Sequence, residues 1–441
     1  MATERTARRV PPIGALLFLS TLVVFIAGAR NGGSGDTMPA QLLPISILVE
    51  GNLDFNEFVC PIDPATLLPS DYVAGRCTTP LPYYLDLVDG RAVSRYPIVA
   101  GLINLPVHLV AYLLQVNLAA YFSLLALITS ALVSAGSVAM MFLVLRELCR
   151  ERSTAVLGAL VYAFGTLVWS VTSRGLWQHG PSLLLINAAL YLLVRREGTG
   201  IPWAGLLLGF AVFNRPTNVL IALPLAVYVL VHHRVHFVRF CAMAAIPAAG
   251  LLLYSQIVLG SVMTLGQGQQ MRLSADPLGN FAGILVSPAR GLFVFSPIFL
   301  LSLLYVPRTL SGAAPHPIVR YLLLATLGLI GLHALWPIWW GGHSFGYRLL
   351  IESIPAWIVL LALGWEETIR RSIPLKSAAA LLLAVSIYFN YLGARVGPCG
   401  FDSTPNSIDS HPERLWQVRD TELIRCTRVL GTRLGVTSPG E

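Results

Sequence analysis

Long apolar segments separated by short polar ones run along nearly the whole sequence, and they predict a series of membrane helices. The first apolar span covers residues 11–28. Later spans are expected at 120–145, 154–172, 180–194, 201–213, 217–231, 239–258, 291–306, 319–336, 347–364 and 377–393. Because about 20 apolar residues suffice to cross a bilayer, we predict an all-α polytopic membrane protein with about eleven transmembrane helices.

Two further apolar segments are predicted to lie on the membrane surface. Residues 96–115 contain Pro97, Pro106 and His108, and a full span here would place the arginine-rich segment 146–152 outside. Arginines near membrane helices concentrate on the cytoplasmic side, so we interpret 96–115 as an interfacial helix. Residues 38–53 are apolar with two prolines, which indicates a second surface helix.

Composition agrees with a membrane protein. Hydrophobic residues make up 55% of the 441 residues, charged residues 12%, and the mean hydropathy is +0.69. A soluble chain of this length needs more charge to cover its surface. The net charge of +8 does not indicate a nucleic-acid partner, since the arginines are scattered at the ends of apolar segments, where they set orientation among the membrane lipids.

These charges predict a multi-pass protein of the cell membrane with its N-terminus in the cytoplasm. Residues 29–95 then form a large first extracytoplasmic loop, and the short tail 394–441 also lies outside. Residues 1–393 form the transmembrane domain. The first span has a basic flank but only a weak small-residue cleavage site at 26–30, so we expect it to be retained.

The cysteines give a partly independent check on this topology. Cys60 and Cys77 share the first loop, and Cys399 and Cys426 share the tail. Two disulfide pairs on an oxidising face are expected, with four unpaired cysteines as the alternative. Two further cysteines fall at inner helix ends: Cys149 and Cys241. No Cys/His spacing typical of zinc and no glycine-rich phosphate loop is present in the sequence.

Asp36 is the candidate catalytic residue. It follows the first span closely, within the glycine-rich run 31–39, where the backbone can approach a ligand. The first loop holds eight acidic residues, most of which are expected to form a solvated face. Asp36 differs from the others because it lies within a few residues of a membrane helix.

Four later outer segments place arginine or histidine beside aromatic residues or glycines: 174–181, 214–218, 287–293 and 336–348. A single such segment is ordinary at a membrane interface, but four on one face indicate a polar cavity. Arginine makes paired bonds to phosphate oxygens, so a lipid phosphate would suit this cavity. The candidate phosphate ligands are Arg348, Arg215, Arg290 and His343. The candidate acceptor or sugar ligands are Asp54, Arg95, Tyr96, Arg174 and His179.

Several of these segments, in this order, resemble the GT-C membrane glycosyltransferases that use polyprenyl-phosphate sugars, a group that includes protein O-mannosyltransferases and lipid A aminoarabinose transferases. Asp36 matches the catalytic aspartate of that group's first outer loop. Further similar segments are 50–54, Arg95-Tyr96-Pro97, Asn214-Arg215-Pro216, 287–291 and 340–348. Two positions depart from the pattern: Thr37 stands where many members have Glu, and Ile98 replaces a second proline.

The resemblance implies transfer of one sugar from a polyprenyl-phosphate donor to an acceptor hydroxyl on the outer face, with inversion. Asp36 would act as general base and the arginines would stabilise the departing phosphate. No cofactor is expected, and a charged leaving group makes metal independence the prediction. The acceptor, whether glycan, lipid or protein, is left open. Alternatives are a transporter or flippase for a lipid-linked or anionic solute, and a polymerase or ligase that uses lipid-pyrophosphate saccharides.

Overall fold

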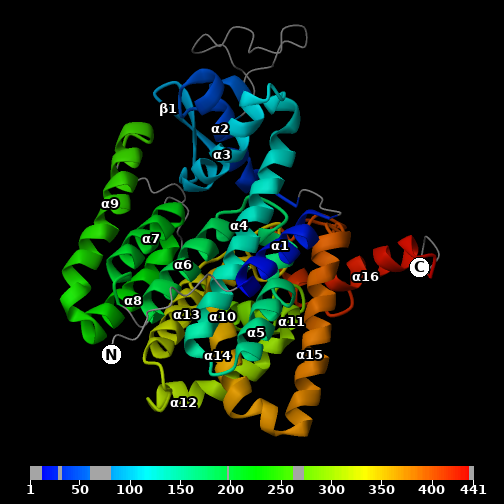
Figure 1. Cartoon of the computed structure of the whole chain (residues 1–441). Coiled ribbons are helices and arrows are strands. Elements are labelled where there is room, and N and C mark those ends of the chain that lie inside the picture. Colours follow the sequence, from blue (N-terminus) through cyan, green and yellow to red (C-terminus); the bar gives the residue numbers. More distant parts are fainter. Residues whose placement is uncertain (1–11, 28–31, 60–80, 196–197, 262–272, 437–441) are drawn as a thin grey trace.

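The computed structural model describes residues 12–27, 32–59, 81–195, 198–261 and 273–436. They form a helical bundle, with a smaller layer of two helices and a β-hairpin over one end (Figure 1). The short helix α12 marks the opposite end of the bundle in the same view. The helical content agrees with the fold class expected from the sequence.

In the described residues, ten of the eleven predicted spans contain a bundle helix, whereas the span predicted at 291–306 is divided into two shorter segments, α11 (Leu292–Phe295) and η7 (Pro297–Tyr305). The bundle helices are α1 (Pro12–Ile26), α4 (Leu118–Leu148), α5 (Arg152–Phe164), α6 (His179–Val194), α7 (Ile201–Asn214), α8 (Val219–His232), α9 (Arg234–Val258), α13 (Ile318–Ala334), α14 (Ile354–Glu367) and α15 (Ile373–Tyr391). Other shorter elements are α10 (Pro277–Val286), α12 (Val306–Leu310) and η8 (Arg348–Ser353). The layer over one end contains α2 (Met38–Ile45), α3 (Val99–Leu113), β1 (Leu85–Val88) and β2 (Arg91–Ser94), and the tail contains α16 (Glu422–Arg433).

A β-hairpin and two helices were not expected from the sequence. The strands β1 and β2 pair antiparallel, with Val88 opposite Arg91 across a turn in which Asp89 and Gly90 have positive φ. An Asp-Gly pair between short strands is a hairpin signal, so this element was detectable. Helix α10 lies in the segment 259–290 predicted as a loop, where the Asp276 side chain caps its first turn. Helix α16 lies in the tail.

Four helical segments of the described chain are long and apolar enough to cross a membrane: Leu118–Leu148, Arg234–Val258, Arg348–Arg371 and Ile373–Val396. The remaining apolar helices in that part of the chain have 10–17 residues. Several are therefore shorter than the roughly 20 residues that a simple span needs. The total of about eleven spans stays a prediction.

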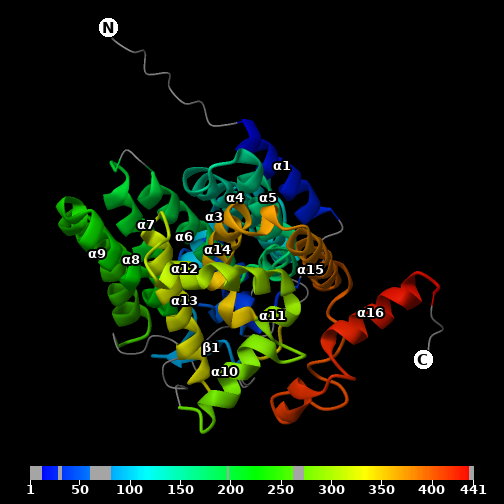
Figure 2. The ribbon, with the colours of Figure 1, turned by 90° about the horizontal axis from the view of Figure 1, so that it is seen from below.

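Burial separates a central helix from helices at the edge. The apolar window of Arg348–Arg371 is 94% buried, whereas that of α9 is 22% buried. In the view along the bundle, α9 lies at the margin and α14 in the middle (Figure 2). Val235 on α9 is 80% exposed and Val238 is 77% exposed. Apolar surface of this extent suits contact with lipid rather than water.

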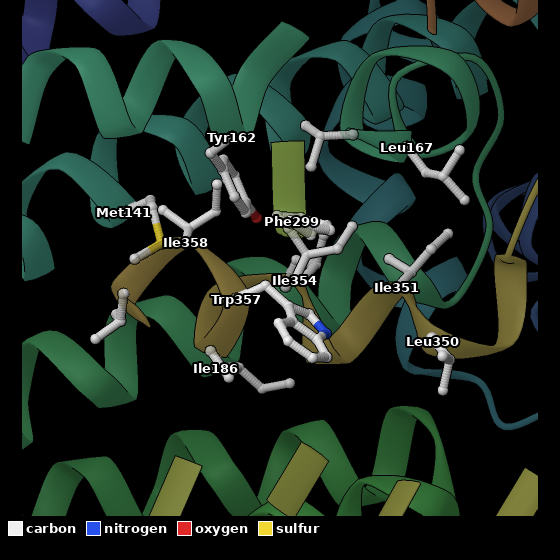
Figure 3. Packing of buried hydrophobic residues seen from close by; sticks show 14 of the residues in the cluster. Met141, Tyr162, Leu167, Ile186, Phe299, Leu350, Ile351, Ile354, Trp357 and Ile358 are labelled. Atoms are coloured by element: carbon white, nitrogen blue, oxygen red, sulfur yellow. The ribbon is translucent and has the colours of Figure 1, made fainter. Parts of the chain in front are cut away.

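The core gathers around α14. Trp357 stacks on Phe299 of η7 with ring centroids 5.9 Å apart, and both pack among side chains of α4, α5 and α6 (Figure 3). Three polar side chains inside this core bond one another: the Tyr162 hydroxyl lies 2.6 Å from Ser137 Oγ and accepts a hydrogen bond from Asn187 Nδ2. Hydrogen bonds of this kind lower the free-energy cost of burying these polar groups.

Helices α7 and α9 approach each other closely through two glycines. A Cβ atom on Gly205 would lie 2.2 Å from the Phe240 carbonyl oxygen, and one on Gly209 would lie 2.6 Å from that of Ala244. The spacing of four residues puts both glycines on one face of α7. Small residues at this spacing allow membrane helices to pack backbone against backbone.

The tail is docked on the loop between α10 and α11. Arg290 of that loop is 1% exposed, and its guanidinium pairs with Asp402 and, at 3.0 Å, with Glu422. The predicted pair Cys399 and Cys426 forms a disulfide. Cys149 and Cys241 are free, as expected, whereas Cys60 and Cys77 lie outside the described residues.

Candidate active site

A cavity of about 650 Å³ is lined by residues of the bundle, of the turn before α2 and of the hairpin region. Its wall combines segments that are far apart in the sequence. The lining residues fall in the segments 34–36, 83–96, 177–179, 215, 336–349 and 409. In the two long segments, 83–96 and 336–349, only some of the residues line the cavity. The hairpin, which contributes Asp86 to the wall, lies at the end of the bundle opposite α12 (Figure 1).

Asp36 is held in the wall of this cavity by three side chains. The residue sits in the turn Gly35–Thr37 at the start of α2, where the Ser34 hydroxyl accepts a hydrogen bond from the Asp36 amide. Asp36 Oδ1 accepts bonds from the Tyr96 hydroxyl at 2.7 Å and the Tyr83 hydroxyl at 2.9 Å. Its Oδ2 accepts a bond from Arg348 at 2.6 Å. The carboxylate is thus fixed in orientation.

These contacts set the ionisation of the three groups. Burial opposes the charge on Asp36, but the Arg348 guanidinium and the two phenol hydrogen bonds outweigh it and hold its pKa below the ordinary aspartate range. Burial and the Asp36 charge raise the pKa of Tyr83 to about 12 and also raise the pKa of Tyr96. At neutral pH the carboxyl is therefore ionised and both phenols remain donors.

Arg348 joins Asp36 to the glycine-rich segment. Its guanidinium lies 4.5 Å from the centre of the Trp177 ring and also donates to the Gly341 carbonyl oxygen. Gly341 and Gly342 both have positive φ, a conformation that favours glycine. A guanidinium on an aromatic face gains a cation–π attraction while its edges stay available for hydrogen bonds.

Arg215 and His179 meet a carboxylate that the sequence did not reveal. Glu352 has a side chain 1% exposed, and its two oxygens accept bonds from Arg215 Nη1 at 3.0 and 2.9 Å. His179 Nδ1 lies 2.8 Å from the same carboxylate. Arg215 and His179 also line the cavity, so this buried group fixes the positions of two wall residues.

The rim of the cavity carries two more charged pairs. Arg95 and Asp86 pair at 2.8 Å beside the hairpin. His343 lies 3.3 Å from Asp409 of the tail, which also accepts a hydrogen bond from the Trp340 indole at 3.0 Å. The tail therefore contributes directly to the cavity wall, a role that the sequence did not indicate.

Three predicted site residues lie away from the cavity. Arg290, predicted as a phosphate ligand, is instead buried and paired with Asp402 and Glu422 of the tail, and it is not part of the cavity wall. Asp54 accepts a hydrogen bond from the Asn56 amide within the first loop. Arg174 is 3% exposed, and its carbonyl oxygen bonds the Gly32 amide. The other predicted site residues, Asp36, Arg348, Arg215, His343, Arg95, Tyr96 and His179, line one cavity.

The sequence patterns did not single out four residues that line the cavity or hold its wall in place. Trp177 lies within a segment already singled out, and Tyr83 precedes the hairpin, so their positions carried a weak signal. Glu352 interrupts an apolar span, which is a recognised sign of function in membrane helices. Asp409 could not be predicted, because the residues around it in the tail form no recognisable motif.

Metal binding is not suggested by the side-chain arrangement in the described ranges. They contain no group of three or more His, Cys, Asp or Glu side chains placed to hold a metal ion. Metal independence stays a prediction for the activity itself.

The comparisons with known proteins give structural neighbours only. No family model matches the sequence, and no curated protein matches it. The crystal structure of the Archaeoglobus fulgidus oligosaccharyltransferase in the apo form is similar with a TM-score of 0.48 and 11% identity, over 94% of this chain and 60% of that one. The structure of the archaeal oligosaccharyltransferase AglB from Archaeoglobus fulgidus in complex with an inhibitory peptide and a dolichol-phosphate is similar with a TM-score of 0.48 and 12% identity. The match covers 92% of this chain and 60% of that one.

A third structure, the same archaeal enzyme tethered to an acceptor peptide, has a TM-score of 0.47 and 11% identity, over 92% of this chain and 59% of that one. The chain thus spans about 60% of the length of these proteins. Each of these TM-scores is below 0.5 and each identity is below 25%, so the matches carry no assignment of family. At this similarity the match does not assign a substrate or a reaction.

Proposed function

We propose that the protein is a GT-C membrane glycosyltransferase that moves one sugar from a polyprenyl-phosphate donor to an acceptor hydroxyl on the extracytoplasmic face. The observation that carries the proposal is the meeting of Asp36, Arg348 and Arg215 in one cavity at one end of an apolar bundle. An ionised carboxylate beside guanidinium groups combines a base with anion-stabilising donors. This combination is what sugar transfer from a lipid phosphate needs.

In the proposed reaction Asp36 takes the proton of the acceptor hydroxyl as its oxygen attacks the anomeric carbon. The bond from that carbon to the phosphate oxygen breaks, and the lipid phosphate leaves with the electron pair. Attack opposite the leaving group inverts the anomeric configuration. Arg348 and Arg215 stabilise the departing phosphate through charge-assisted hydrogen bonds, with His343 at the rim as a further donor.

The remaining wall suits a sugar. Trp336 offers an aromatic surface, and Asp86, Arg95 and Tyr96 supply polar groups elsewhere in the wall. Pockets that combine apolar surface with a few placed polar groups orient small polar ligands. We therefore assign the hairpin side of the cavity to the sugar and acceptor.

The position of the cavity supports an enzyme over a transporter. A transporter places its substrate site near the middle of the membrane, at the interface of internal repeats. Here the cavity opens under the first loop, and Asp36 lies in its wall. The proposal places this end of the bundle outside the plasma membrane, with the N-terminus in the cytoplasm.

The test uses native membranes, which contain the endogenous acceptors, supplied with radiolabelled polyprenyl-phosphate mannose or polyprenyl-phosphate arabinofuranose. Asp36→Asn is expected to lower transfer by about 10²–10⁴-fold, because a positioned base contributes this much. Asp54→Asn is the matched control, since Asp54 is a first-loop acid outside the cavity wall, and it should keep full activity.

Equal amounts of folded protein must be compared, as judged by size-exclusion chromatography in detergent. Undiminished transfer by folded Asp36→Asn would remove Asp36 from the mechanism. Absence of transfer from either donor by the wild-type protein would contradict the proposed donor class.

A further inference from the structure

The proposed reaction needs Asp36 free to bind the acceptor hydroxyl and Arg348 free to bind the leaving phosphate. The acceptor hydroxyl needs an oxygen of Asp36, and the leaving phosphate needs the Arg348 guanidinium. In the structure these two groups are bound to each other at 2.6 Å. The phenols of Tyr96 and Tyr83 already occupy the other oxygen of Asp36.

We propose that Arg348 exchanges partners during the cycle: the donor phosphate draws the guanidinium away from Asp36 and so frees Oδ2 for the acceptor hydroxyl. The inference rests on the proposed function and adds a binding order to it. Donor comes first, because the base is engaged until the phosphate arrives.

Arg215 and Arg348, the two cavity arginines proposed to hold the phosphate, differ in how deeply their carboxylate partners are buried. Glu352 is 1% exposed and holds Arg215 through both oxygens, so withdrawing Arg215 would leave a charge isolated in the interior. Asp36 is 20% exposed and its pair with Arg348 uses one oxygen. Arg348 is therefore the guanidinium that can change partner at low cost.

The surroundings of Arg348 fit such a movement. Its Nε is buried and has no hydrogen-bond partner among the described residues, so one donor remains for a phosphate oxygen. The Trp177 face can stay in contact while the guanidinium shifts, since a cation–π attraction has little directional demand along the ring. The preceding glycines at 341, 342 and 346 have positive φ and add no side-chain bulk.

Asp36 would keep its orientation after the exchange, because the Tyr83 and Tyr96 hydroxyls still hold Oδ1. Its basicity would change. Burial raises the pKa of Asp36 and Arg348 lowers it, so loss of the Arg348 contact moves the pKa upward. A base with a higher pKa accepts the acceptor proton more readily.

The exchange can be tested without an acceptor by using polyprenyl phosphate that carries no sugar. The Asp36 carboxylate is followed by infrared difference spectroscopy, with Asp36→Asn as the reference, while pH is varied. The wild-type carboxyl is expected to protonate at a higher pH when polyprenyl phosphate is bound than in the ligand-free protein. Polyprenyl phosphate binding is measured in parallel by isothermal titration calorimetry.

Arg348→Gln separates the exchange from simple repulsion by the phosphate. In this variant the ligand-free carboxyl should already protonate at the higher pH, and saturating polyprenyl phosphate should add no further shift. A shift of wild-type size in Arg348→Gln would show that the phosphate charge acts alone, which overturns the exchange. Arg308→Gln is the matched control, because Arg308 pairs with Glu367 outside the cavity, and it should titrate like wild type.

The two proposals fail in different ways. Absence of polyprenyl phosphate binding to the wild-type protein would contradict the donor class and the exchange together. Binding with no change in the Asp36 titration would overturn the exchange alone and leave Asp36 and its cavity as the site of transfer.

Discussion

The disulfide between Cys399 and Cys426 makes a quantitative prediction about the tail. The two residues are separated by 27 positions, and the closed segment contains Asp402, which pairs with Arg290, and Asp409, which lines the cavity. Closing a loop of this length removes conformational freedom from the undocked tail. The chain-entropy relation gives a stabilisation of about 3.5 kcal/mol for the docked tail.

The perturbation is the double substitution Cys399→Ser with Cys426→Ser. We expect the helical bundle to remain folded, because the packing around Trp357 of α14 is made by side chains of other bundle elements, such as Phe299. Opening of the tail should become easier by about 3.5 kcal/mol. Hydrogen exchange of residues 399–426 measures this directly as a loss of protection. Cys241→Ser is the control, since Cys241 is a free cysteine on α9. Sugar transfer should fall in the double variant, because Asp409 leaves the wall.

Two results would refute this reasoning. Equal protection of residues 399–426 in the double variant and in wild type would show that the disulfide does not restrain the tail. Reaction of both cysteines with a maleimide in denatured, unreduced protein would show that the disulfide is not formed.

Two other predictions concern single contacts. Gly35→Ala would place a Cβ 2.4 Å from the Tyr83 hydroxyl oxygen, so we expect the hydrogen bond from Tyr83 to Asp36 to be lost. The kcat for sugar transfer should then fall while the melting temperature stays unchanged. An unchanged kcat would count against a role for this phenol. Arg290→Met leaves Asp402 unpaired beside a buried glutamate and should destabilise tail docking by about 3 kcal/mol or more, measured by the same exchange experiment. The KM for the donor, measured at low temperature, should not rise in this variant, because Arg290 does not line the cavity. A higher KM would indicate that Arg290 contributes to donor binding.

Sequence patterns predicted the helices well because the signal is local. Apolar runs with arginines at their ends define each span, and the predicted span 239–258 corresponds to α9 at Arg234–Val258. Asp36 could be singled out for a similar reason, since its distance from the first span and its glycine neighbours are readable from a few residues. The disulfide partners shared one short tail, which left few alternatives.

Some local signals were present and were passed over. The Asp89-Gly90 pair predicts a hairpin, and Asp276 followed by Pro277 predicts the start of α10. Gly205 and Gly209 have the spacing of a close helix contact. These elements are therefore within reach of sequence analysis.

The sequence by itself determined that this is an apolar helical chain with a carboxylate beside its first span and arginines at one end. Only the tertiary structure decided which arginine meets which carboxylate. Arg348 pairs with Asp36 across 312 positions, Arg215 pairs with Glu352 inside the bundle, and Arg290 pairs with the tail. The reason is physical: helix formation depends on neighbours within a few residues, whereas the pairing of charges depends on which buried surfaces pack together.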